Sequence, residues 1–90
     1  MIKDKLTRDD FKKEHVGGVL YLSYVGKNCE ICIESGFGCI DIAVYDLKKD
    51  LLEPKETIST RIVSAIGMID YFKKIDKAVN NFYQKWEVEK

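Results

Sequence analysis

The chain has 90 residues, of which 46% are hydrophobic and 33% are charged, a balance typical of a folded globular protein rather than a disordered one. Fifteen Lys and Arg offset fifteen Asp and Glu, so the chain lacks the large basic excess typical of domains that grip nucleic-acid phosphates. We expect residues 1–90 to form a single small α+β domain that needs no cofactor.

The first fifteen residues are rich in charge and contain no apolar core, which argues against a secretory signal peptide. Apolar runs nowhere approach the ~18–20 residues of a membrane-spanning helix, so we expect no membrane contact. Three cysteines are an odd number for a disulfide framework, and we expect reduced thiols in a cytoplasmic protein.

A helix over residues 8–16 is the first predicted element. Thr7 is a candidate N-cap, and Asp10 stands at the capping-box position. Gly17 and Gly18 then provide a C-terminal stop.

Three strands of an antiparallel meander are predicted next. Residues 19–25 are β-branched and aromatic, residues 29–34 alternate Ile with polar side chains, and residues 39–46 alternate again. Gly-containing turns separate the three segments, which favours two successive hairpins.

The segment CEICIESGFGC, residues 29–39, contains all three cysteines. In a hairpin, Cys29 shares the buried face with Ile31 and Ile33, whereas Cys32 and Cys39 share the other face with the acidic residues. Because the two thiols of the CxxC pattern point to opposite faces of a strand, we predict packing cysteines rather than a metal site or a redox pair.

Residues 29–46 carry four acids and no Lys or Arg. Three of them, Glu30, Glu34 and Asp41, are predicted to share the solvent face of the sheet. We expect this face to be open to water or to a partner.

From residue 58 onward the apolar period changes to that of a helix. Apolar side chains recur at steps of three, four and seven, namely Ile58, Ile62, Ala65, Ile69, Phe72, Val79, Tyr83 and Trp86. The pattern predicts an amphipathic helix of about thirty residues on one sheet face, either continuous or kinked or broken near Gly67. The predicted order is therefore αβββα, or αβββαα if the helix breaks.

Such a helix would be ~45 Å long, against ~23 Å for a seven-residue strand, so it would overhang the sheet. The apolar residues of the overhanging end are Val79, Phe82, Tyr83 and Trp86. Three arrangements could bury this apolar end. The helix could fold back on itself, the N-terminal helix could reach it, or another chain could cover it, either as a homodimer or as a different protein. The last alternative makes these residues candidate partner contacts.

No acid–base pair, nucleophile or phosphate loop is recognisable, and we expect a non-enzymatic interaction protein such as an inhibitor, an immunity protein or a phage-type accessory factor. The alternative is a nucleic-acid-binding module that uses Lys73, Lys74 and Lys77. Helix, three strands, helix is also the element order of double-stranded-RNA-binding domains, although their lysine cluster begins the last helix.

Overall fold

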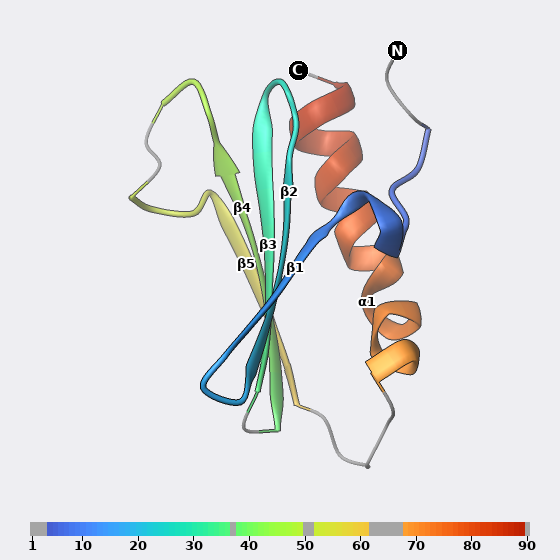
Figure 1. Cartoon of the computed structure of the whole chain (residues 1–90). Helices are drawn as coiled ribbons and strands as arrows, with labels where there is room; N and C mark the ends of the chain where they lie inside the picture. Colours follow the sequence, from blue (N-terminus) through green and yellow to red (C-terminus); the bar gives the residue numbers. More distant parts are fainter. Residues whose placement is uncertain (1–3, 37, 50–51, 62–67, 90) are drawn as a thin grey trace.

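In the computed structural model, the described residues are 4–36, 38–49, 52–61 and 68–89. Within them, five strands form one antiparallel sheet in chain order, and a C-terminal helix packs on one face (Figure 1). The fold is α+β, but the predicted αβββα arrangement is wrong. The elements are η1 (Arg8–Asp10), β1 (Lys12–Val16), β2 (Val19–Val25), β3 (Cys29–Gly36), β4 (Cys39–Asp46), β5 (Glu56–Arg61), α1 (Met68–Tyr83) and η2 (Gln84–Val88).

Strand β1 replaces most of the helix predicted at residues 8–16. The capping pair does form, because Thr7 N donates to Asp10 Oδ2 at 2.8 Å, but it caps only the single 3-10 turn η1. Gly17 and Gly18 have φ values of +56° and +83°, which suit a two-residue hairpin loop rather than a helix stop. All five β1 side chains are exposed, so backbone pairing with β2 defines this strand.

Strand β5 occupies the place where the long helix was predicted to begin. It pairs antiparallel with β4, and Ile58 lies opposite Ile42. The described helix instead starts at Met68, has 16 residues, and continues into the five-residue π-helical segment η2. The predicted thirty-residue helix is therefore wrong, and its predicted kink at Gly67 lies outside the described residues.

The core lies between the sheet and α1, on what we call the inner face of the sheet. Ile31, Ile33 and Ile42 are at most 1% exposed, so the predicted burial of the isoleucines is confirmed. Burying an aliphatic side chain of this size contributes about 1.5–3 kcal/mol. The helix contributes Ile75, Val79, Phe82 and Tyr83 to the same cluster.

The N-terminal segment lies on the same side of the sheet as α1 (Figure 1). Leu6 is buried, and its backbone is held by Asn80: Leu6 N donates to Asn80 Oδ1 at 2.7 Å, and Asn80 Nδ2 donates to Leu6 O at 3.2 Å. The Asn80 amide thus satisfies both backbone groups of Leu6, as a neighbouring strand would. No helix among the described residues is both long and apolar enough to cross a membrane.

Candidate binding face

The face of the sheet turned away from α1, here called the outer face, gathers the predicted acidic residues. The strand register places Tyr21 opposite Glu34, Glu34 opposite Asp41, and Asp41 opposite Ser59. Glu30 lies four residues before Glu34 on β3 and therefore shares its face. The structure brings Glu30, Glu34 and Asp41 together on one side of β3 and β4.

Glu34 and Asp41 form a like-charged cross-strand pair. Both residues are exposed, and directly opposite residues have Cβ atoms about 4.5–5.5 Å apart. Ser59 Oγ donates a hydrogen bond to Asp41 Oδ1. Within the described part of the chain, neither carboxylate makes an ion pair.

A shallow hollow of about 210 Å³ lies beside this pair. Its volume is below the usual range of small-ligand pockets, about 300–1,000 Å³. Val19 and Gly36 line it together with Glu34, Cys39 and Asp41. The hollow therefore suits a protruding side chain better than a whole small molecule.

Two tyrosines border the acidic residues. Tyr21 is 37% exposed, and Tyr45, which is half-buried, lies opposite Glu30. Tyrosine is enriched in protein–protein interfaces, because its ring provides apolar contact area and its hydroxyl can hydrogen-bond to water or to the partner.

Cys32 and Cys39 point to the outer face as predicted, whereas Cys29 is fully buried on the inner face. Cys32 Sγ donates to Glu30 Oε2 at 3.5 Å. Burial, followed by the charge of Glu30, raises the pKa of Cys32 to about 12, so this thiol stays protonated near neutral pH. Among the described residues, no group of three or more His, Cys, Asp or Glu is placed to hold a metal ion.

The apolar residues predicted as partner contacts lie elsewhere. Val79, Phe82 and Tyr83 are buried in the core of the single chain. Trp86 is half-buried against that core, and its Nε1 donates to Glu56 Oε2 at 2.6 Å. Because the sheet covers this end of the helix, the overhang that motivated a partner there does not exist.

Of the three lysines proposed to meet nucleic acid, Lys77 is exposed on α1. The side chains of Lys73 and Lys74 lie outside the described part of the structure. The likeness in element order to double-stranded-RNA-binding domains is lost, since β1 stands where their first helix would be.

The sequence interpretation missed a buried carboxylate. Glu87 in η2 is 2% exposed, and it accepts backbone hydrogen bonds from Lys27 (3.0 Å), Asn28 (3.0 Å) and Cys29 (3.2 Å) in and after the β2–β3 turn. We call this group of contacts the Glu87 clasp. A Cβ at Gly26 would lie 2.6 Å from Glu87 Cδ, so only glycine fits beside the carboxylate.

The Tyr24 hydroxyl and the Cys29 thiol lie near the Glu87 clasp, and the pKa of each is raised. Burial, followed by the charge of Glu87, raises the pKa of Tyr24 to about 12 and that of Cys29 to about 12. Both groups therefore stay protonated at neutral pH, and the Glu87 carboxylate is held by backbone N–H donors. Its burial makes it a structural element rather than an accessible site.

Comparison with known proteins found no matching family, no similar curated protein and no similar solved structure.

Proposed function

We propose that this chain is a small non-enzymatic interaction module that binds a basic surface of another protein through its outer sheet face. The face is open because α1 and the N-terminal segment both lie on the other side of the sheet (Figure 1). An inhibitor that blocks its target by surface contact is the simplest form of such a module.

The observation that carries the proposal is the exposed Glu34–Asp41 pair. Like charges directly opposite one another on neighbouring strands destabilise a sheet. Residues 29–46 contain no Lys or Arg, so a Lys or Arg of a partner could pair with both carboxylates on binding.

Charge complementarity of this kind accelerates association and selects among partners. It is also screened by salt, since exposed charges interact over about 10 Å at 0.1 M ionic strength. We therefore expect partner binding to weaken as salt is raised.

The substitution Glu34→Lys should abolish partner binding without destabilising the fold. Glu34→Lys would place a cation opposite Asp41 and leave the Ser59–Asp41 hydrogen bond in place. A favourable cross-strand pair contributes roughly 0.2–1 kcal/mol, so the variant should unfold at the same or higher urea concentration while losing its partner.

The measurement is affinity capture from the native host's lysate with chemical cross-linking, at two salt concentrations. Glu53→Lys is the matched control, because Glu53 is exposed but lies outside the outer sheet face. Equal capture by the wild-type chain and the Glu34→Lys variant would disprove the proposal, as would capture that survives Glu34→Lys but not Glu53→Lys. The solution mass, measured by light scattering, distinguishes another protein from a second copy of the chain.

A further inference from the structure

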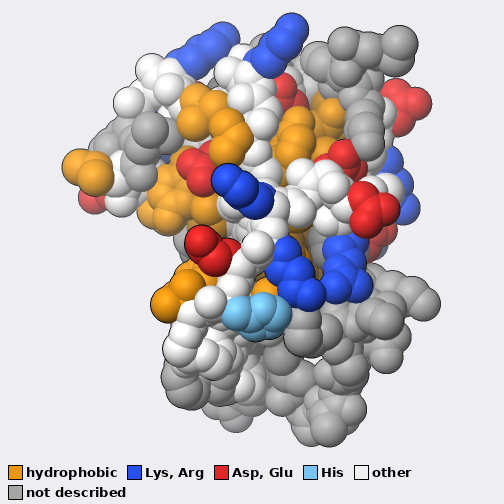
Figure 2. Space-filling model, in the orientation of Figure 1, with side chains coloured by type: hydrophobic (Ala, Val, Ile, Leu, Met, Phe, Trp, Pro, Cys, Tyr) orange, Lys and Arg blue, Asp and Glu red, His pale blue; other side chains and the backbone are white. Residues whose placement is uncertain are grey.

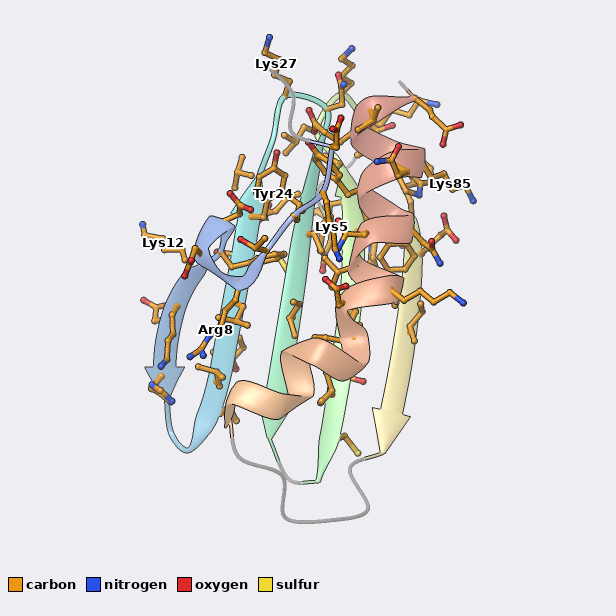
Figure 3. All side chains as sticks on the ribbon, turned by 90° about the vertical axis from the view of Figure 1, so that its right-hand side faces the viewer. Lys5, Arg8, Lys12, Tyr24, Lys27 and Lys85 are labelled. Atoms are coloured by element: carbon orange, nitrogen blue, oxygen red, sulfur yellow. The ribbon has the colours of Figure 1, made fainter. Side chains whose placement is uncertain are left out.

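A second hollow, of about 300 Å³, lies on the inner-face side at the β1 edge of the sheet. It is lined by Arg8, Asp9, Phe11, Lys13 and Leu22. Figure 3, viewed from the helix side, shows Arg8 over β1 and β2 and to one side of α1. The hollow is thus separate from the acidic outer face.

Strand alternation separates the cations of β1 between the two faces. Lys13 lies opposite Leu22, a core residue, so Lys13 is on the inner side. His15, two residues on, shares that side. Lys12 lies opposite Ser23 and points to the outer side. Basic side chains and the histidine gather on the face of the molecule that carries β1 (Figure 2).

The guanidinium of Arg8 has donor capacity that the fold does not use. Arg8 is half-buried, yet within the described residues its side chain makes no hydrogen bond or ion pair. The neighbouring Asp10 carboxylate accepts from Thr7 instead. A guanidinium with five N–H donors matches the two oxygens of a carboxylate.

Two residues that line the hollow, Phe11 and Leu22, are apolar. Phe11 is 8% exposed and Leu22 is 3% exposed, so each presents only a small apolar surface at the base. The volume is at the lower end of the range for small-ligand sites, about 300–1,000 Å³.

We propose that this hollow binds a small organic carboxylate, whose anionic group meets Arg8 and Lys13 and whose apolar body rests on Phe11 and Leu22. Asp9, which also lines the hollow and is exposed, disfavours multiply charged anions. The site is independent of the acidic outer face and does not rest on the function proposed for that face.

Octanoate is a suitable probe, with inorganic phosphate as the anion without an apolar body. Each is titrated into the ¹⁵N-labelled full chain, and amide shifts are followed by NMR. Octanoate should saturate with shifts centred on residues 8–13 and Leu22. Replacing Arg8 and Lys13 together by Gln should weaken binding by about tenfold or more, because hydrogen bonds to charged groups are lost.

Lys12→Gln is the control, since it removes one positive charge from the other side of the same strand. The Arg8→Lys variant, which retains the charge but not the planar donor pair, should bind with intermediate affinity. Unchanged far-ultraviolet circular dichroism establishes that each variant is folded.

Three results would overturn the proposal. The first is the absence of saturable shifts with octanoate up to about 10 mM. The second is a loss of affinity in Lys12→Gln as large as that of the double substitution, which would indicate general charge attraction. The third is binding of phosphate as tight as that of octanoate, which would remove the role of Phe11 and Leu22.

Discussion

Asn28 donates two hydrogen bonds to Glu87, one from its backbone amide and one from its side chain. The Asn28 backbone amide donates to Glu87 Oε1 at 3.0 Å, and Asn28 Nδ2 donates to the Glu87 carbonyl oxygen at 3.0 Å. The two residues are 59 positions apart. This double contact fixes the end of the helical segment to the β2–β3 turn.

Replacing Glu87 by Gln should destabilise the fold by about 1.5–3 kcal/mol. The substitution keeps the size of the side chain, but an amide NH₂ would then face backbone N–H donors. Urea unfolding followed by circular dichroism measures the change in free energy. Glu89→Gln, at an exposed neighbouring position, should change it by less than about 0.5 kcal/mol; equal effects of the two substitutions would contradict the buried role of Glu87.

Replacing Asn80 by Ala should loosen the N-terminal segment more than the rest of the molecule. The change removes both hydrogen bonds to Leu6 and should cost about 1–3 kcal/mol, since two backbone groups lose their partner. Hydrogen exchange of the Leu6 amide should accelerate, while amides in β3 and β4 should change much less. The exposed neighbour Asn81 provides the control Asn81→Ala, and an unchanged Leu6 exchange rate in Asn80→Ala would count against this anchoring role.

Lowering the pH should detach Trp86 from Glu56. The hydrogen bonds from Lys85 (2.8 Å) and then Trp86 (2.6 Å) hold the pKa of Glu56 below its usual value of 4.5. Because the pKa of Glu56 is lower in the folded chain than in the unfolded chain, the ionised carboxylate stabilises the fold above pH 4.5. This stabilisation is lost as the pH falls through the folded-state pKa. Trp86, the only tryptophan, should report this step by its fluorescence.

The Glu56→Gln variant is the control for that titration. Its amide cannot ionise, so the fluorescence step below pH 4.5 should be smaller than in the wild-type chain. Identical titration curves would show that another group controls Trp86.

The three thiols should react at different rates. Cys39 is exposed, Cys32 is half-buried and Cys29 is fully buried, and only a thiolate attacks a disulfide reagent. With a disulfide reagent at pH 8, Cys39 should react first and Cys29 only on unfolding. Mass spectrometry of the labelled peptides measures the order, and early modification of Cys29 in the native chain would refute it.

The same burial links Cys29 to stability at alkaline pH. Its pKa rises from 9.0 to about 12 in the folded chain, so the folded state binds more protons than the unfolded state between these values. The stabilising contribution is complete below pH 9 and is lost as the pH rises toward 12. Urea midpoints should therefore fall over this range, and less steeply in the Cys29→Ala variant than in the Cys39→Ala control.

Alternation of apolar and polar residues predicted the three central strands, because β2, β3 and β4 each bury one face. The two edge strands, β1 and β5, were missed because they do not bury one face. The β1 side chains are all exposed, and the described interior of β5, from Thr57 to Ser59, is exposed as well, so neither carries a strong apolar period. Their pairing depends on turns and backbone hydrogen bonds.

The candidate sites were predictable to different degrees. The shared face of Glu30, Glu34 and Asp41 follows from strand parity alone, whereas the exposed end of the helix was inferred from a helix length that included β5. Nothing in the sequence marks Glu87 as buried, because its partners are backbone amides, which every turn possesses. The pairing of Arg8 with Lys13 was not predicted, because a helix was expected over residues 8–16 where the structure has η1 and β1.

The strand order β1-β2-β3-β4-β5 joins only strands that are consecutive in the chain. The contacts that bring the N-terminal segment to the helix, Leu6 with Asn80 and Asp4 with Gln84, span 74 and 80 residues. Closing a long loop costs more conformational entropy than closing a short one, and non-local contacts form late. We therefore expect the hairpins to assemble one after another during refolding, and the meeting of the two ends to be the slow, final event.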